Sequence, residues 1–363
     1  MTFDKAQRAI YIDFESTART GDRPALLGVV RPGGAVTQYV VDPALANAVA
    51  AHPDCRRAAL PDLLEQLAAE CADGRHLVSW SRFDLQVIEA SRAVPSVARA
   101  LRAAHFNALD LVPKWGLTYG FRADPQRFAG RNQLHKFFPL AGYRPDWHYE
   151  NAAPAAWIRH VRTQMAANGG HYQRVNRPTK SDWHQLLTYN RHDCLGLRHL
   201  VLRAAAETEK RRAYLEATYA VDTGTGIVNF KIGAKKDSLD KLLTRYAATS
   251  WAHVTACNPG LATRSPADND SANQKLADTL RHRRYTVLAG DGHDDSGRWP
   301  TEPAWFVVGI DEADARRLAR EFGQWAIVTG RIGEAARLAW CLDRGPDLLV
   351  TRQLQAASDA SAD

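Results

Sequence analysis

Four acidic residues and one tyrosine have the types and spacing that metal-dependent phosphoryl chemistry requires. Asp13 and Glu15 lie in the run AIYIDFES, and Asp84 lies in LVSWSRFDLQVI. Tyr189 and Asp193 lie in LTYNRHDCLGLRHL. Clustered carboxylates repel one another and are costly to bury unpaired, so several in one cleft usually indicate bound cations. Hard oxygen ligands select Mg²⁺ or Mn²⁺ over zinc or copper. Two such ions about 4 Å apart can bind the attacking and leaving oxygens of an in-line displacement, which is nuclease chemistry.

Two short strands are expected to position the first three acids. Residues 9–12 (AIYI) are apolar and β-prone. Because residues two apart on a strand share a face, Asp13 and Glu15 would project side by side. Residues 77–80 indicate a short buried strand that continues into a helix near Asp84. Asp84 would then lie at a strand-to-helix junction.

A helix is expected to carry the other two residues. Apolar residues recur at helical spacing after Ser181 or Asp182, either of which can cap the helix. They are Trp183, Leu186, Leu187, Leu197, Leu200 and Val201. Residues four apart on a helix share a face, so Tyr189 would lie one turn from Asp193.

This order of motifs resembles a known superfamily. Asp-x-Glu, then Asp after Phe, then Tyr-x-x-x-Asp is similar to the DEDD 3′-to-5′ exonucleases in their tyrosine-bearing (DEDDy) form. Residues 107–111 (NALDL), 132–143 (NQLHKFFPLAGY) and 189–194 (YNRHDC) are similar to the predicted RNase-H-like exonucleases of the RecB-associated branch. The similarity covers roughly residues 7–207. It implies an α/β fold, with an RNase-H-like mixed sheet flanked by helices.

The resemblance also implies roles. Asp13 matches the acid that bridges two divalent metal ions, Mg²⁺ or Mn²⁺, and Glu15, Asp84 and Asp193 match the other metal-binding acids. Tyr189 matches the residue that orients the attacking water. A phenol with a pKa of about 10 is a poor base at neutral pH, so positioning by hydrogen bonding is the better role. The structural alternatives are a solvated strand end for Asp13 and Glu15, a helix cap for Asp84 and a core tyrosine for Tyr189.

Candidate substrate contacts lie close to these motifs. They are Phe14, Arg82, Lys136 and His192. Histidine-bearing relatives place their histidine five positions before the last Asp, where this chain has Thr188, so His192 could equally be a surface or packing residue. Cations and aromatic rings alternate over residues 114–144, which suits a single nucleic-acid strand. A solvated loop with ordinary core aromatics is the alternative.

The amino-acid composition of the chain is typical of a protein that binds a polyanion. The chain has 363 residues, a net charge of +7 and 45% hydrophobic residues, so it is long enough for two cores. Its excess of cations favours nucleic acid as the partner, and the resemblance to 3′-to-5′ exonucleases implies one with a free 3′ end. Five cysteines without a CxxC pair predict neither a zinc ribbon nor a disulfide framework. With no signal peptide and no long apolar run, the expected location is the cytoplasm, without a membrane partner.

The sequence predicts a first domain over residues 1–210, a smaller α/β accessory domain over 211–345 and a disordered tail over 346–363. The second domain is expected to begin with a helix over 213–221 and to have a turn over 290–299. Its motifs TACNPG and FGQWAI resemble the domain-of-unknown-function family numbered 3293, over about residues 213–340. Five polar residues could line a ligand pocket there, or be turn and cap residues. They are Thr255, Asn258, Asn273, Glu302 and Gln324.

The sequence therefore predicts a 3′–5′ exonuclease that releases 5′-nucleotides from single-stranded nucleic acid, with DNA favoured over RNA. One alternative is a structure-directed endonuclease on the same fold. The other is a non-catalytic nucleic-acid-binding or assembly protein whose second domain recruits a protein partner. Retention of all four acids together with Tyr189 argues against a pure binder, because unneutralised carboxylates repel phosphates.

Overall fold

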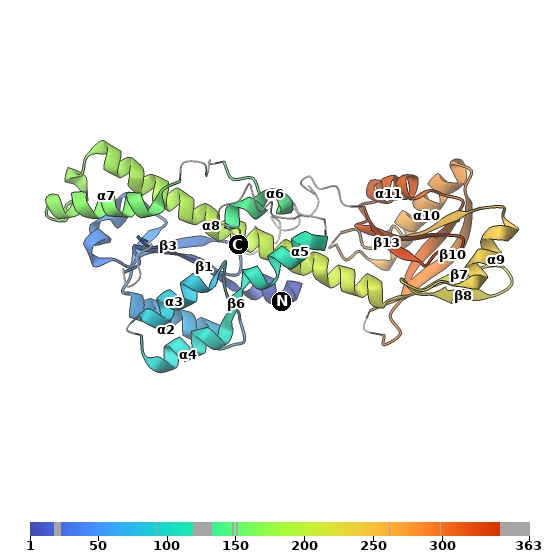
Figure 1. Ribbon diagram of the computed structural model, residues 1–363, viewed down its shortest axis with the longest axis horizontal. Helices are drawn as coiled ribbons and strands as arrows, with labels where there is room; N and C mark the ends of the chain where they lie inside the picture. The colour runs from blue at the N-terminus through green and yellow to red at the C-terminus, as the bar shows by residue number, and fades with distance from the viewer. Residues whose placement is uncertain are drawn as a thin grey trace. The chain divides into compact units, whose positions relative to one another are not determined.

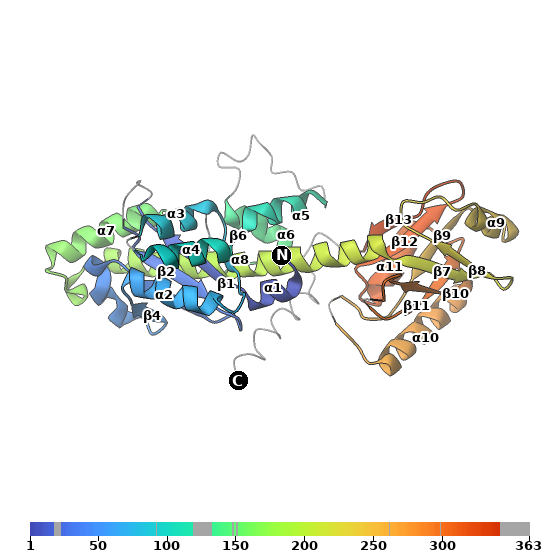
Figure 2. The ribbon, with the colours of Figure 1, turned by 90° about the horizontal axis from the view of Figure 1, so that it is seen from below.

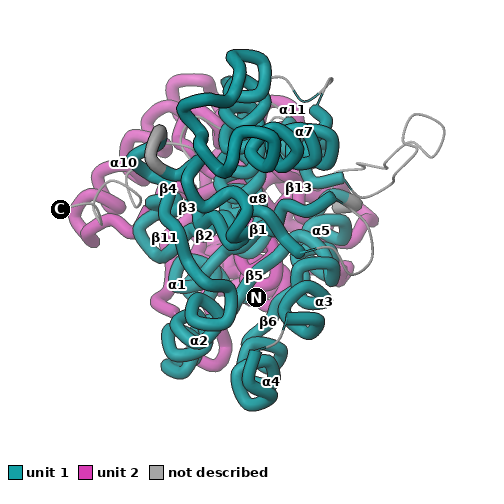
Figure 3. The backbone as a smooth tube through the Cα atoms, turned by 90° about the vertical axis from the view of Figure 1, so that its left-hand side faces the viewer, with its two compact units in different colours: residues 1–206, 354–363 teal, residues 207–353 magenta. Residues whose placement is uncertain are grey.

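The chain forms two compact units, which meet in sequence between residues 206 and 207 (Figure 3). The computed structural model describes residues 1–17, 23–91, 93–118, 133–146, 149, 152–260, 262–297 and 299–341. The predicted tail over 346–363 lies outside the described residues, as does the middle of the cation-rich and aromatic stretch, residues 119–132. Each unit has its own sheet and its own hydrophobic cores.

The first unit is built on a mixed six-stranded sheet. The strand order is β4-β3-β2-β1-β5-β6. The strands are β1 (Ile10–Glu15), β2 (Leu26–Val30), β3 (Val36–Val40), β4 (Cys55–Arg57), β5 (Leu77–Ser79) and β6 (His105–Asn107). Strand β1 pairs antiparallel with β2 and parallel with β5, and so stands at the point where the sheet changes from antiparallel to parallel. The expected α/β class with a mixed sheet flanked by helices is confirmed.

Helices cover both faces of this sheet (Figures 1 and 2). One face carries α2 (Leu60–Cys71), α3 (Arg82–Ala90) and α4 (Pro95–Ala104), and the other carries α7 (Pro154–Ala167) and α8 (Arg177–Glu216). The shorter helices are α1 (Phe3–Arg8), α5 (Val112–Thr118), α6 (Phe138–Ala141), η1 (Pro43–Ala51), η2 (Ala108–Asp110), η3 (Leu134–Phe137) and η4 (Tyr172–Arg174).

Alternation along β1 decides which residues face which helices. Ile10, Ile12 and Phe14 pack in the core formed with α2, α3 and α4. Because successive side chains of a strand point to opposite faces, Asp13 and Glu15 lie on the other face, where α8 packs. Asp13 and Glu15 therefore share one face of the sheet, as their spacing of two residues predicts.

Helix α8 begins earlier and ends later than the sequence indicated. The start was expected at Ser181 or Asp182, but the side chain of Asn176 accepts a hydrogen bond from the backbone N–H of Thr179 (3.0 Å), and α8 already begins at Arg177. The helix continues to Glu216, although the sequence predicted that a separate helix begins at residue 213. Its apolar face packs against the sheet of the first unit, and this tertiary contact supports a helix of 40 residues.

The second unit contains a curled, antiparallel seven-stranded sheet of order β13-β12-β9-β11-β10-β7-β8. The strands are β7 (Thr218–Asp222), β8 (Ile227–Phe230), β9 (Ser250–Val254), β10 (Thr286–His293), β11 (Glu302–Val308), β12 (Ala326–Arg331) and β13 (Arg337–Trp340). The helices are α9 (Asp237–Arg245), α10 (Pro266–His282) and α11 (Glu312–Glu321). Apolar residues of α10 and α11 pack in one core and those of α9 in another.

Two local expectations for the second unit were wrong. The helix expected over 213–221 gives way to strand β7, because Tyr219 and Val221 alternate into the core beside Phe230. The turn expected over 290–299 starts late, since β10 pairs with β7 as far as His293. Glycines at 290 and 292 lie within that strand rather than in a turn. Cross-strand pairing therefore overrides the local turn signal.

None of the helices in the described ranges has the length and apolar character needed to cross a membrane.

Candidate metal centre

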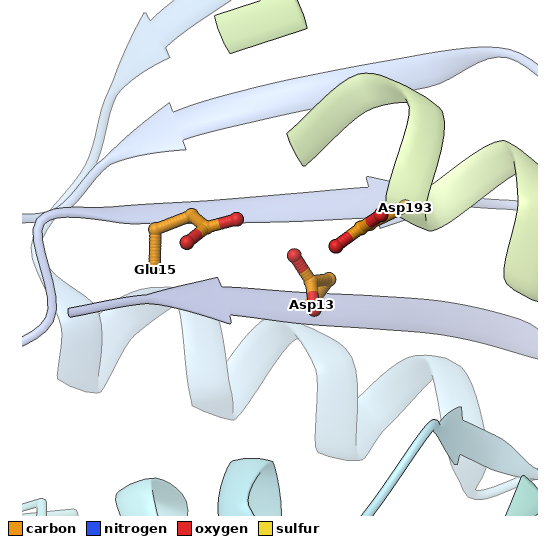
Figure 4. A group of neighbouring side chains, drawn as sticks. All are labelled: Asp13, Glu15 and Asp193. Carbon is orange, nitrogen blue, oxygen red and sulfur yellow. The ribbon is translucent and has the colours of Figure 1, made fainter. Parts of the chain in front are cut away.

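Three carboxylates from two elements converge in the first unit (Figure 4). Asp13 and Glu15 project from β1 toward α8, and Asp193 projects from α8 toward β1. One ligand oxygen from each lies within 4.8 Å of the other two. Glu15 and Asp193 are buried, and Asp13 is half-buried. This grouping holds three of the four acids that the sequence predicted as metal ligands.

Electrostatics disfavours three ionised carboxylates at this place. Burial, and then the charge of Asp193, raises the pKa of Asp13 to about 8. Burial, followed by the charges of Asp13 and Asp193, raises the pKa of Glu15 well above its ordinary value. Burial also raises the pKa of Asp193, to about 7. A divalent cation would favour the ionised forms of all three.

Two buried oxygens of the group have no hydrogen-bond partner among the described residues. They are Oε1 of Glu15 and Oδ1 of Asp193. A buried acceptor without a partner costs about 1–3 kcal/mol, so native structures seldom keep one unless an ion or water occupies it. The residues present therefore fit a hard divalent cation held by oxygen ligands.

Asp84 lies beside this group but outside it. Its Oδ1 accepts a hydrogen bond from the backbone N–H of Phe14 (2.9 Å), which joins the first turn of α3 to β1. Burial, and then the charge of Asp13, raises the pKa of Asp84 to about 8. Its side chain is 3% exposed. The strand-to-helix position was expected, and the contact with β1 shows how α3 delivers the acid close to Asp13.

An amide network that the sequence did not predict orients Asp13. The side-chain amide of Asn190 donates to Oδ2 of Asp13 (2.9 Å) and to its backbone oxygen (3.0 Å). Gln38 on β3 donates in turn to Oδ1 of Asn190 (3.0 Å) and to the carbonyl of Leu187 (2.8 Å). Asn190 precedes Asp193 by three positions, so helical spacing was an available signal for it. Gln38 is distant in sequence from these acids, so no local spacing indicated that it would reach them.

Close packing of α8 on the sheet depends on Gly28. Strand β2 places Gly28 directly opposite Asp13. A Cβ at this position would lie 2.4 Å from Oδ1 of Asn190 and 2.4 Å from Sγ of Cys194. Such distances are far inside van der Waals contact, so any side chain here would displace the side chains of Asn190 and Cys194 on α8.

Tyr189 and Tyr149 both lie near the third carboxylate. Burial has the larger effect on the pKa of Asp193 and raises it, whereas the two phenols lower it. Burial and the neighbouring charges raise the pKa of Tyr189 above its ordinary value. Its phenol is therefore neutral and is a donor rather than a base. The sequence predicted Tyr189 but missed Tyr149, which no helical or strand spacing relates to the acids.

The predicted substrate contacts lie in different environments. The ring of Phe14 is 4% exposed and belongs to the core beneath α2, α3 and α4, because alternation on β1 points it away from the acids. Arg82 is exposed at the start of α3, and Lys136 is half-buried in η3. His192 contacts the hydroxyl of Tyr143 (3.0 Å) through Nδ1 and Asp146 (2.9 Å) through Nε2.

In the second unit, the five predicted pocket residues come together around the loop over 255–260. Thr255 and Asn273 both donate to the carbonyl of Pro303 (2.8 and 2.9 Å). Asn258 donates to Oε1 of Glu302 (2.7 Å). Gln324 donates to the carbonyl of Cys257 (2.8 Å). These bonds hold the loop against β11, which favours the turn-and-cap interpretation over a ligand pocket.

Comparison with known proteins bears on the second unit. Residues 254–327 match the model of a family described as Protein of unknown function (DUF3293). The second of the two resemblances read from the sequence is thus supported over this range. The comparisons with curated proteins and with solved structures give no match for the chain.

Proposed function

We propose that the first unit is a metal-dependent 3′–5′ exonuclease of the RNase-H-like DEDDy type, which hydrolyses single-stranded nucleic acid. The observation that carries this proposal is the convergence of Asp13, Glu15 and Asp193 within 4.8 Å, with two of their buried oxygens lacking a partner among the described residues. The mixed sheet with helices on both faces is the architecture that the resemblance implies.

Each residue of the centre has its own role in the proposed hydrolysis. Asp13, Glu15 and Asp193 would hold divalent Mg²⁺ or Mn²⁺, which stabilises charge on phosphoryl oxygens and lowers the pKa of water. Asp84 adds negative charge beside Asp13 and fixes α3 on β1. Tyr189 holds a water by hydrogen bonding, and its raised pKa keeps the phenol proton in place.

Charge supports the choice of a nucleic-acid substrate. The chain carries 47 Lys and Arg against 40 Asp and Glu, a net charge of +7. Since three of the acids lie together at the candidate centre and Asp84 is buried beside them, the excess of cations over the remaining surface is larger than this number suggests. DNA remains our preference over RNA, and the experiment below compares the two sugars directly.

Digestion of 5′-labelled oligonucleotides tests the proposal. Single-stranded DNA and RNA would be incubated with Mg²⁺ or Mn²⁺ and with the wild type, Asp13→Asn or Asp193→Asn. We expect a ladder that shortens from the 3′ end for the wild type and intact substrate for both variants. Internal cuts would instead support the endonuclease alternative. Intact substrate with folded wild-type protein would contradict nuclease activity and favour a binding or assembly role.

A further inference from the structure

The second unit has a pocket of about 390 Å³ at one end of its curled sheet. It lies where β9 begins at Ser250, where β11 ends at Val308 and where β10 begins at Thr286. Residues that follow the last turns of α9 and α10 supply the rest of its lining. Small-molecule sites have volumes of about 300–1,000 Å³, so this pocket is large enough for a small ligand.

The polar side chains of the pocket have donors to offer such a ligand. Among the described residues that line it, Arg284 alone carries a charge. Its guanidinium has no hydrogen-bond or ion-pair partner in the described part of the chain. The same is true of the hydroxyl groups of Thr249, Ser250 and Thr286. These groups suit a ligand that accepts several hydrogen bonds and is negatively charged.

The backbone of Arg284 adopts a conformation that favours glycine. Its φ is 65°, and it directly follows the C-cap of α10. The N–H of Tyr285 donates to the carbonyl of Leu280 (3.1 Å), and the N–H of Arg284 donates to that of Arg281 (2.8 Å). Glycine usually occupies this position of a Schellman motif, because a Cβ is strained there. An arginine where glycine would be more stable indicates a use for its side chain.

An aromatic ring lies in the same pocket. Tyr246 is 39% exposed and has no ring contact with the described residues. A guanidinium binds phosphate through two parallel hydrogen bonds, and an exposed ring can stack on a base. Asp314 accepts a hydrogen bond from the Tyr285 hydroxyl (3.3 Å) and also pairs with Arg317, so its charge is compensated. Cation, hydroxyls and ring together are the groups that recognise a nucleotide.

We propose that this pocket binds one nucleotide, with the phosphate on Arg284 and the base on Tyr246. The nucleotide is either a unit of a single strand or a free 5′-nucleotide, since both present the same chemical groups. The choice of a nucleotide among phosphate-bearing ligands rests on the function proposed for the first unit. The pocket and its unpartnered arginine do not depend on that function.

A structural role for Arg284 makes a different prediction about stability. An arginine near the C-terminus of a helix can interact favourably with the last carbonyls and with the helix dipole. Arg284→Gly would then lower the Tm. If the side chain serves a ligand instead, the variant relieves the strain of a positive φ, and the Tm stays the same or rises. Arg284→Asn is the second variant, because Asn also tolerates this conformation.

The experiment measures binding by the full chain in a chelator, so that hydrolysis does not interfere. The probes are deoxyadenosine 5′-monophosphate, in calorimetric titration, and a short labelled oligo(dA), in fluorescence anisotropy. We expect both Arg284 variants to weaken binding by about 10-fold or more, and Tyr246→Ala to weaken it by about fivefold or more. Binding of the oligonucleotide alone would assign the strand as the ligand, and binding of the mononucleotide alone would assign the free nucleotide.

Two variants serve as matched controls. Arg264 is also exposed and without a side-chain partner in the described part of the chain, but it lies before the other end of α10, about 25 Å away along a helix of this length. Ala247, with a φ of 50°, has the same position after α9 that Arg284 has after α10. Arg264→Gln tests charge alone and Ala247→Gly tests strain alone. Each should change affinity by less than about twofold.

Several results would overturn the inference. They are binding of neither probe by the wild type, affinity of Arg284→Gly within about twofold of the wild type, and an equal loss in Arg264→Gln, which would indicate non-specific attraction. A lower Tm in both Arg284 variants would assign the residue to the helix cap. Hydrolysis of the labelled oligonucleotide with Mg²⁺ is measured separately. Its absence, with binding that depends on Arg284, would overturn the exonuclease alone, and its presence with unchanged binding in Arg284→Gly would overturn the pocket alone.

Discussion

At the scale of single residues, the carboxyl groups of Asp13, Glu15 and Asp193 favour protonation when no cation is bound. Burial raises the pKa of each, and the charge of a neighbouring acid adds to it: Asp193 for Asp13, Asp13 and Asp193 for Glu15, and Asp84 for Asp193. Protonation and cation binding both relieve the repulsion, so they compete for the same oxygens. Two consequences follow, one for the pH dependence of stability and one for the amide that orients Asp13.

The first prediction concerns pH. The pKa of Asp13 is about 8 in the folded chain against an ordinary value of 3.8. Because the folded state holds this proton more tightly, the stability it contributes is complete below the ordinary pKa and is lost as the pH rises through the folded one. We expect the free energy of unfolding of the metal-free wild type, compared with that of Asp13→Asn, to fall between about pH 4 and about pH 8.

Urea unfolding in the presence of a chelator measures this difference. Asp54→Asn is a suitable control, because the Asp54 side chain is 68% exposed and its contact with Arg191 is long, at 3.5 Å. Buried His199 and His253 have lowered pKa values and change stability in the opposite direction at acid pH, but they are common to all three proteins. Equal pH dependence in wild type and Asp13→Asn would contradict the prediction.

The second prediction concerns Asn190. Replacing it by alanine removes the donor to Asp13 and leaves Gln38 without one of its acceptors. We expect Asn190→Ala to lower the free energy of unfolding by about 1–3 kcal/mol and to weaken Mn²⁺ binding by about 10-fold. Asn47→Ala is the matched control, because Asn47 donates to the carbonyl of Gly170 (2.8 Å) at an exposed position. Mn²⁺ affinity equal in both variants would argue against an orienting role.

At the scale of elements, the centre depends on how closely α8 approaches its neighbours. Gly28 on β2 allows Asn190 and Cys194 to reach the sheet, and Gly196 on α8 allows the same for Phe138 of α6, whose ring atoms would lie 2.2 Å from an added Cβ. At both glycines the nearest atoms belong to side chains of the facing element, and the missing Cβ leaves room for them. The approach of α8 to β2, the strand beside β1, therefore depends on Gly28.

The third prediction follows for Gly28→Ala. The added methyl group would overlap two side chains at 2.4 Å, so we expect the free energy of unfolding to fall by about 1–3 kcal/mol and Mn²⁺ affinity to fall with it. Gly292→Ala is the control, since its Cβ would meet only the Tyr219 ring at an ordinary 3.5 Å. The measurement is urea unfolding of both variants. A Gly28→Ala protein as stable as Gly292→Ala would show that α8 can move away without cost.

At the scale of the whole molecule, two units with separate cores share one chain. The acids that form the candidate centre all lie in the first unit, and the DUF3293 match lies in the second. A ligand that binds one folded unit stabilises that unit by mass action. The units are therefore expected to respond differently to metal.

The fourth prediction is made for calorimetric melting. Mn²⁺ at about 100 times its Kd should stabilise the first unit by about 2.7 kcal/mol and raise one transition while leaving the other unchanged. Asp13→Asn should abolish that rise. Glu302→Gln, which weakens the contact with Asn258 in the second unit, should lower only the other transition and leave the metal effect intact. A single transition that moves as a whole would show that the units unfold cooperatively.

The sequence by itself determined the local geometry of the centre. Spacing of two on a strand placed Asp13 and Glu15 on one face, and spacing of four on a helix placed Tyr189 one turn from Asp193. Such periodicities depend only on the backbone, so they can be inferred without knowing the partner elements. The mixed sheet with flanking helices did not follow from these periods but was implied by the family resemblance that the order of the motifs carries.

Only the tertiary structure decided which distant groups meet these acids. Gln38 and Gly28 reach the centre from strands whose spacing relative to the acids carries no local signal. The same holds for the strand β7, where pairing with β10 replaced an expected helix. The physical reason is that a backbone period fixes the direction of a side chain on its own element, whereas the packing of whole elements fixes what that side chain meets.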